Sequence, residues 1–397
     1  MQFEFATAGR IIFGRHALGE AAPIIADHGS RVLLLTGRDG RRAASLKADL
    51  ENRGCEVMPF SVCGEPTLSR VQDAVKTAHD TRCHAVVGFG GGSIIDLGKA
   101  VAALVTNEGD LMDHLEVIGR GQPLLNPPLP FIAIPTTAGT GTEVTANAVI
   151  KSPEHGRKVS LRGTFLLPAV AVVDPALSLS LPPSLTAATG MDALTQLIEA
   201  FVTRKANPVT DSLCREGLCR VGRSLRQAWL NGNDLDARED MSLAALFSGM
   251  ALANAGLGAV HGFAAVIGGM MEIPHGIVCA RLLYPVLRVN LERLRQTGGT
   301  SSTLQKFHEM GRLLTGNSGA HAEDGLEWIR LLCTEFCLLP LGLAGLRDKD
   351  YATIAAMAQQ SNSMRGNPVE LAQGDLIRIL EMEKSMDAAG GRVNSRL

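Results

Sequence analysis

The order of apolar and amphipathic segments constrains the fold of this chain more than any other feature of its sequence. In the first half, short apolar runs alternate with stretches of helical periodicity. Strands are expected at residues 31–36, 56–62, 84–89, 130–134 and 169–173, and helices at 41–52, 67–79 and from about Ile94 onward. This alternation is typical of a parallel sheet covered by helices.

The pattern changes near residue 181. From there the periodicity is helical, and few β-branched runs interrupt it. Helices are expected at 184–203, 236–255, 325–336, 348–361 and 371–388, with loops at 297–303 and 315–324. The sequence therefore predicts an α/β domain over residues 1–180 and an all-helical domain over residues 181–397.

Charge and composition exclude several functional classes. The formal net charge is −2 with both signs interspersed, so nothing indicates a nucleic-acid partner. No run approaches the ~18 apolar residues of a membrane span, and the first residues do not resemble a signal peptide. The eight cysteines form no CxxC pair, which favours reduced thiols. A cytoplasmic location without a membrane partner is expected.

Two glycine-rich loops follow predicted strands. The first runs from the strand at 84–89 through Gly90, Gly91 and Gly92 to Ser93, which is placed to cap the next helix. Glycines and a helix amino terminus suit phosphate binding, although the segment is not a GxGxxG motif and a tight turn without ligand is the alternative. The second loop, residues 135–145, places five threonines around two glycines and suits a cofactor site or a polar surface loop.

Three ionisable residues in apolar surroundings of the helical half indicate a metal site. Asp192 lies inside a predicted helix, with Gln196 on the same face. Downstream, His261 and His275 each precede a glycine in a largely apolar stretch. Buried carboxylates and imidazoles need partners, so a mixed oxygen and nitrogen site for a divalent cation is one interpretation. Core histidines bonded to carbonyl groups are the other.

Several of these motifs occur together in one known family. The Gly90–Lys99 segment, the 135–145 loop, the segment around Asp192 and the Ile273–Gly276 segment occur in the same order as in iron-containing (group III) alcohol dehydrogenases, which the chain resembles over nearly its whole length. The resemblance implies a dinucleotide-binding domain, a helical domain and an active site in the cleft between them. It also implies a homo-oligomer, since members often form dimers or larger assemblies.

The resemblance also assigns roles to individual residues. Asp192, His261 and His275 match three of the family's four metal ligands and would be catalytic through the metal. Gln196 stands where the fourth, a histidine, is normal; an amide is a weaker ligand than imidazole, so iron, zinc, manganese or no metal are all compatible. The cofactor-binding positions are Gly37, Arg38, Gly91, Gly92, Ser93, Asp96, Thr136, Thr137, Thr140, Thr145, Asn147 and Lys158.

Two further departures from the family bear on specificity. Ala265 replaces a histidine that many members carry near the substrate, which removes a candidate proton relay. Gly37 replaces an aspartate that favours NAD, and the arginines that follow, beginning with Arg38, favour the 2′-phosphate of NADP. We therefore expect NAD or NADP as cofactor, with NADP preferred.

The resulting functional prediction is an NAD(P)-dependent oxidoreductase that interconverts a small alcohol and its carbonyl compound, assisted by a divalent metal. The main alternative is a metal-independent reductase of an acidic carbonyl compound, similar to maleylacetate reductases, in which Arg157, Lys158 and Arg162 neutralise the acid. A lyase similar to dehydroquinate synthase, and a cofactor-binding protein without catalysis, are further alternatives.

Overall fold

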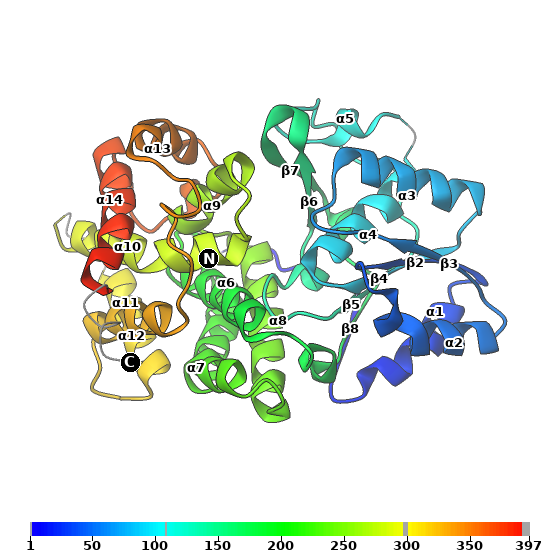
Figure 1. The fold of residues 1–397 in the computed structure, drawn as a ribbon, viewed down its shortest axis with the longest axis horizontal. Helices are drawn as coiled ribbons and strands as arrows, with labels where there is room; N and C mark the ends of the chain where they lie inside the picture. The colour runs from blue at the N-terminus through cyan, green and yellow to red at the C-terminus, as the bar shows by residue number, and fades with distance from the viewer. Residues whose placement is uncertain (1, 108, 297–300, 391–397) are drawn as a thin grey trace. The chain divides into compact units, whose positions relative to one another are not determined.

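The computed structural model describes residues 2–107, 109–296 and 301–390. The chain forms two compact units (Figure 1). One spans Phe5–Leu181; the other begins at Pro182 and includes the residues before Phe5. The first unit is α/β and the second is all-helical in the described residues, which confirms the fold class expected from the sequence.

A six-stranded parallel sheet forms the centre of the first unit. Its strand order is β1-β8-β5-β4-β2-β3. The five strands expected from the sequence all form, with ends within about one residue of those expected, and one further strand lies at an edge. The strands are β1 (Arg10–Phe13), β2 (Arg31–Thr36), β3 (Glu56–Ser61), β4 (Ala85–Gly90), β5 (Phe131–Pro135) and β8 (Val170–Val173).

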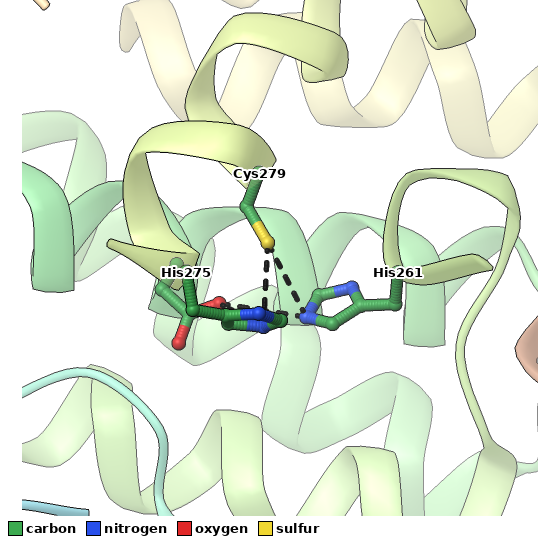
Figure 2. Close-up of side chains that lie close together, drawn as sticks. His261, His275 and Cys279 are labelled. Carbon is green, nitrogen blue, oxygen red and sulfur yellow. Dashed lines mark hydrogen bonds and ion pairs between the residues drawn. The ribbon is translucent and has the colours of Figure 1, made fainter. Parts of the chain in front are cut away.

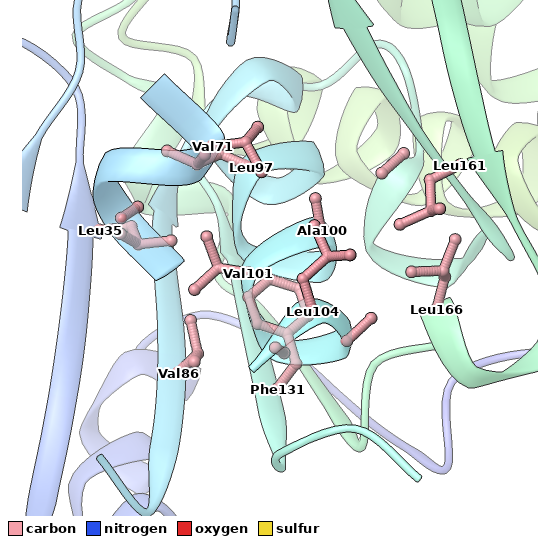
Figure 3. Close-up of a cluster of buried hydrophobic side chains, with 14 of the residues drawn as sticks. Leu35, Val71, Val86, Leu97, Ala100, Val101, Leu104, Phe131, Leu161 and Leu166 are labelled. Carbon is pink, nitrogen blue, oxygen red and sulfur yellow. The ribbon is translucent and has the colours of Figure 1, made fainter. Parts of the chain in front are cut away.

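Helices cover both faces of this sheet, which is why its central strands are apolar on both sides. In β2, Leu33 and Leu35 face the core beneath α3 (Leu68–Asp80) and α4 (Gly92–Leu104). Figure 3 shows part of this core. Val32 and Leu34 face the opposite core, against α1 (Ala21–Ala26) and α2 (Ala44–Asn52).

Several elements of the first unit were not expected from the sequence, among them β1, α1, an antiparallel hairpin and a short helix before β5. An antiparallel hairpin of β6 (Asn147–Ser152) and β7 (Arg157–Arg162) follows the threonine-rich loop. It packs beside α4, and its Ala148, Ile150, Val159 and Leu161 complete the core around that helix. A short helix, α5 (Leu111–His114), precedes β5. The hairpin was missed because each of its strands buries only two apolar residues, so its apolar pattern is weak.

The second unit consists of helices in its described residues. Its helices are α6 (Pro183–Val202), α7 (Pro208–Leu230), α8 (Leu235–Ala255), α9 (Ala259–Met270), α10 (His275–Gln296), α11 (Ser301–Thr315), α12 (Ala322–Glu335), α13 (Tyr351–Gln359) and α14 (Gln373–Gly390). The loop expected at 297–303 is wrong at its end, because residues 301–303 begin α11; residues 297–300 lie outside the described residues. Helix α6 packs against α7, α8 and α10 and is buried around nearly its whole circumference.

Among the described residues, no single helix is both long and apolar enough to cross a membrane. The helices α8 and α9 reach that length and composition only as a pair, which is bent by 99°.

The close approach of α4 to β5 depends on Gly98. A Cβ at this position would lie 2.2 Å from Cε2 of Phe131, so Gly98→Ala should force the ring or the helix to move. We expect a loss of about 1–3 kcal/mol in the free energy of unfolding, measured by urea denaturation. Gly19→Ala is the control because nothing lies within 4 Å of its added Cβ. Equal stability of the two variants would contradict this packing argument.

Candidate active site

Three helices of the second unit bring a cluster of potential metal ligands together. Asp192 comes from the middle of α6, His261 from the first turn of α9, and His275 begins α10. Cys279 follows one turn after His275, and one ligand atom from each of the four residues lies within 4.8 Å of the others. Figure 2 shows the Cys279 sulfur pointing at the two imidazole rings.

The carboxylate of Asp192 has an unsatisfied oxygen. Its Oδ1 is buried and has no hydrogen-bond partner among the described residues. The nearest nitrogens are Nε2 of His261 at 3.4 Å and Nε2 of His275 at 3.7 Å. A buried carboxylate oxygen without a partner is costly, which favours a cation at this point.

Glu199 fixes the orientation of His261. This buried carboxylate lies 2.6 Å from His261 Nδ1 and also accepts the backbone N–H of Val260 at 2.7 Å. Because Nδ1–H donates to Glu199, a neutral His261 presents the lone pair of Nε2 to Asp192 and Cys279. Carboxylate-oriented histidines of this kind are typical of metal sites.

The electrostatics of the cluster follow from its burial and its mixed charges. Burial alone would lower the pKa of His261, but Cys279, Asp192 and Glu199 outweigh burial and raise this pKa well above its ordinary value. The pKa of His275 is raised in the same way, against burial, by Cys279 and Asp192. Burial opposes the charge of Asp192, yet the two histidines hold the pKa of its carboxyl below the usual range. A divalent cation would replace the protons that these groups otherwise share.

Gln196 lies beside the cluster in a different role from the one expected. Its Oε1 accepts a hydrogen bond from Ser248 Oγ at 2.7 Å, and its Nε2 donates to Asp192 Oδ2 at 3.4 Å. The amide nitrogen, rather than the oxygen, thus faces the carboxylate. Metal ligation by Gln196 stays a prediction, while the structure shows it as a hydrogen-bond partner of Asp192.

The first glycine-rich loop joins β4 to α4. Gly91 is the residue before the helix, α4 begins at Gly92, and no side chain caps it. The expectation that Ser93 caps this helix is therefore wrong: Ser93 lies in the first helical turn. Ile94 N–H donates to Gly91 O at 2.9 Å, which leaves the amide groups of Gly92 and Ser93 as the first-turn donors that could bind a ligand.

The threonine-rich loop packs directly on the glycine loop. The backbone N–H of Thr136 donates to Gly90 O at 2.9 Å, as β4 and β5 are neighbours in the sheet. A Cβ on Gly92 would lie 2.8 Å from Thr140 Oγ1, and a Cβ on Gly91 would lie 3.3 Å from Thr137 Cγ2. A side chain at position 92 would therefore displace Thr140 and one at position 91 would crowd Thr137, so the two glycines favour the close approach of the loops.

These loops lie at the position where doubly wound sheets bind ligands. From β2 the chain passes to β3 on one side and then to β4 on the other side of β2. The strand order thus reverses between β2 and β4, and ligands bind outside the carboxyl ends of strands at such a point. Gly37 follows β2 and Gly91 follows β4, so the predicted cofactor positions flank the reversal.

A buried lysine that was not expected holds the second loop in shape. Lys99 Nζ donates to the hydroxyl groups of Thr142 and Thr145 and to the carbonyl oxygens of Thr145 and Asn147, at 2.8–2.9 Å. Thr142 in turn donates to Asp96 Oδ1 at 2.5 Å. Asp96, Thr145 and Asn147, predicted to line the cofactor site, thus take part in this network.

The remaining predicted positions have partners within the first unit. Arg38 donates to Cys63 Sγ, and Lys158 forms an ion pair with Glu65. Arg41 pairs with Asp39, and Arg42 turns toward Thr136 and the carbonyl of Leu177. Arg38 and Arg41 thus have partners close to Gly37 in the chain or in space, while Arg42 contacts the second loop through Thr136.

Comparison with known proteins places the chain in a family. Residues 8–175 match the model described as iron-containing alcohol dehydrogenase, and residues 186–383 match the C-terminal model of the Fe-containing alcohol dehydrogenase family. The chain belongs to the iron-containing alcohol dehydrogenase family. It is thus an alcohol dehydrogenase, an enzyme that interconverts an alcohol and its carbonyl compound, as predicted from the sequence. Members of this family use NAD(H) and iron or another divalent metal.

Individual relatives agree with this assignment. A 1,3-propanediol dehydrogenase from Klebsiella pneumoniae is 35% identical over 366 residues, which cover 89% of this chain and 90% of the relative. A crystal structure of 1,3-propanediol oxidoreductase superimposes with a TM-score of 0.89 at 32% identity, over 96% of this chain and 100% of the other. Sulfoacetaldehyde reductase from Bifidobacterium kashiwanohense, in complex with NAD+, superimposes with a TM-score of 0.86 at 26% identity, over 97% and 99%.

Sequence analysis assigned no individual role to four residues of these two regions: Lys99, Thr142, Glu199 and Cys279. Helical spacing held a signal for two of them. Glu199 follows Asp192 by seven residues, two helical turns, and Cys279 follows His275 by four, so each shares a face with a predicted ligand. Lys99 and Thr142 had no comparable signal, because their contact joins segments 43 residues apart.

Glu143, beside the lysine network, should make stability depend on pH. Burial raises its pKa from 4.5 to about 7, although its own backbone N–H and Lys99 oppose this. The folded state therefore keeps a proton that the unfolded state loses, and stability falls as pH rises from about 4.5 through about 7. Glu143→Gln removes this loss, so its advantage over wild type should grow by about 2–3 kcal/mol between about pH 5 and about pH 8.

Denaturant titration at both pH values measures this difference. Glu154→Gln, which changes an exposed side chain of the same unit, is the control and should keep a constant difference from wild type. A constant difference for Glu143→Gln as well would show that Glu143 is not held neutral by burial.

Proposed function

We propose that this alcohol dehydrogenase acts on small alcohols and aldehydes with a divalent cation held by Asp192, His261 and His275. The unpaired, buried Oδ1 of Asp192 is the observation that supports this proposal. The two histidines reach it from other helices, so the three side chains meet at one point. Zinc and iron are both compatible with these ligands.

The cation would serve as a Lewis acid that stabilises negative charge on the substrate oxygen. Asp192 contributes the negative charge that balances it, and Glu199 orients His261. Gln196 holds the second oxygen of Asp192, which keeps the carboxylate from rotating. The established reaction exchanges a hydride with nicotinamide, so these residues serve to place the carbonyl group and to stabilise its charge.

The substrate proton needs a route that does not include the side chain of Ala265. It follows His261 by one turn of α9, and its methyl group cannot carry a proton. Its side chain is exposed in the structure, which leaves room for a solvent molecule at that position. We infer that the substrate proton exchanges through water or through a cofactor hydroxyl.

The cofactor is assigned to the carboxyl edge of the parallel sheet. The amide groups of Gly92 and Ser93 at the start of α4 and the threonine loop packed against them suit a pyrophosphate. The residues proposed to bind or shape this site are Gly37, Arg38, Gly91, Gly92, Ser93, Asp96, Thr136, Thr137, Thr140, Thr145, Asn147 and Lys158. NADP is the preferred cofactor in this proposal, because Gly37 and Arg38 provide no carboxylate against a 2′-phosphate.

An acidic carbonyl substrate is the second candidate function. A structural relative, named above, is a sulfoacetaldehyde reductase, and its substrate carries a negative charge. In this chain Lys158 and Arg162 of the β6–β7 hairpin already pair with Glu65 and Glu116. These ion pairs reduce the positive charge available to an acid and favour a neutral substrate.

Removing both imidazoles tests the metal role. His261→Ala/His275→Ala should lose bound metal and at least about 10³-fold in turnover with an aldehyde panel, because the cation then lacks both of its imidazole ligands. NADPH affinity, measured by fluorescence titration, should stay within about twofold of wild type. Metal content is measured by elemental analysis, and oxo acids in the same panel test the second candidate. Full turnover by this double variant would end the proposal.

Gly37→Asp tests the cofactor preference. Nothing lies within 4 Å of a Cβ at Gly37, so the first carbon of an aspartate side chain meets no neighbour there. Its charge should repel the 2′-phosphate and lower kcat/KM for NADPH by about 10–100-fold, with little change for NADH. The measurement is the ratio of the two kcat/KM values at fixed aldehyde concentration. An unchanged ratio would mean that the adenosine ribose does not bind next to Gly37.

A further inference from the structure

A cysteine that the family resemblance does not assign points into the proposed metal site. Cys279 is fully buried and lies on α10 one helical turn after His275. Its Sγ is 3.5 Å from Nε2 of His275 and 3.8 Å from Nε2 of His261 (Figure 2). The sulfur thus faces the same nitrogen atoms that face Asp192.

We propose that Cys279, as a thiolate, is the fourth protein ligand of the cation, in place of the histidine that position 196 lacks. This proposal rests on the metal-assisted function above and adds the ligand set Asp192, His261, His275 and Cys279. It also assigns the kind of metal: a thiolate favours zinc over harder ions such as manganese or magnesium.

The separations among these atoms fit one small cation. With the usual zinc bond lengths, a tetrahedral site places nitrogen and oxygen ligands about 3.3 Å apart and sulfur and nitrogen about 3.6 Å apart. The distances from Asp192 Oδ1 to the two imidazole nitrogens are 3.4 and 3.7 Å. Those from Cys279 Sγ are 3.5 and 3.8 Å. All four are therefore close to the edges of such a tetrahedron.

The directions of the hydrogen bonds around the cluster support the same conclusion. Glu199 takes the Nδ1 proton of His261, so a neutral ring offers an acceptor atom to the cluster. Asp192 Oδ1 is an acceptor as well, without a hydrogen-bond partner among the residues described. Acceptors that converge in a buried place repel one another unless a cation or protons lie among them.

Gln196 does not occupy the fourth position. Its oxygen accepts from Ser248, a residue of α8, and its nitrogen faces Asp192 Oδ2. To ligate through oxygen, the amide would have to turn so that its nitrogen, instead of its oxygen, faces Ser248. We assign Gln196 as a positioning residue that holds Asp192, and Cys279 as the ligand.

Cobalt(II) substitution of the full-length protein distinguishes these roles, because cobalt occupies zinc sites and a bound thiolate adds a charge-transfer band in the near ultraviolet. The wild-type protein should show this band. Cys279→Ser should lose the band. It should also weaken zinc binding by more than about 100-fold, since loss of a residue that only supports a ligand typically costs about 10–100-fold in metal affinity. Gln196→Leu should keep the band, with a smaller loss of affinity.

Two further variants separate ligation from folding. Cys333→Ser changes another buried thiol, which donates to Ala280 O, and should keep the band. Gln196→His/Cys279→Ala, which installs the histidine normal in the family, should restore metal affinity without the band. Circular dichroism shows whether each variant is folded.

The spectrum can overturn the proposal independently of the proposed function. A wild-type cobalt protein without the band, or Cys279→Ser with wild-type zinc affinity, would exclude Cys279 as a ligand even if the enzyme reduces aldehydes. Conversely, a sulfur-to-cobalt band in a protein that turns over no alcohol or aldehyde would support the ligand set and contradict the function.

Discussion

The negative charge of Asp192 is buried in the middle of helix α6, and much of the second unit is arranged around that charge. A carboxylate in this position is unfavourable unless other groups compensate it. Gln196 bonds to one of its oxygens, while the other faces two imidazoles and is near a thiol. His261 lies in the first turn of α9, His275 begins α10 and Cys279 follows one turn later, so both helices bring these groups to Asp192 near their amino-terminal ends.

Buried charges are compensated by neighbouring polar groups in the cofactor region of the first unit as well. Burial lowers the pKa of Lys99 to about 8, against the attraction of Asp96 and Glu143, yet its ammonium group is surrounded by oxygen atoms of the threonine loop. Burial likewise raises the pKa of Asp96, against the opposing influence of Lys99 and Thr142. The buried side of the loop is thus bonded to Lys99 through Thr142, Thr145 and Asn147.

The sequence was most informative where a regular apolar pattern defined an element or surrounded an ionisable residue. The strands of the parallel sheet were predicted because buried parallel strands are continuous apolar runs between glycines and prolines. Asp192, His261 and His275 were predicted because they are ionisable residues in apolar surroundings, and their family order supported them. The β6–β7 hairpin and α9 were missed, since the first is short and partly exposed and the second contains three glycines that blur its helical pattern.

Tertiary contacts explain what else could not be predicted. The partner of Gln196 is Ser248, which belongs to another helix, so only the folded structure shows which way the amide faces. The role of Lys99 likewise depends on a tertiary contact, because the threonines that it bonds to lie in the loop after β5. A cysteine among eight gives no sign of ligation until its neighbours are known.

The origin of the four clustered side chains in three different helices has a mechanical consequence. A bound ion would connect α6, α9 and α10 directly, at the point where Gly276 lets α10 approach the backbone of Ala188. Loading would then reinforce the helical unit as a cross-link does, by an amount that grows with the logarithm of free metal concentration. Chelators would thus affect the heat resistance of this enzyme as well as its turnover.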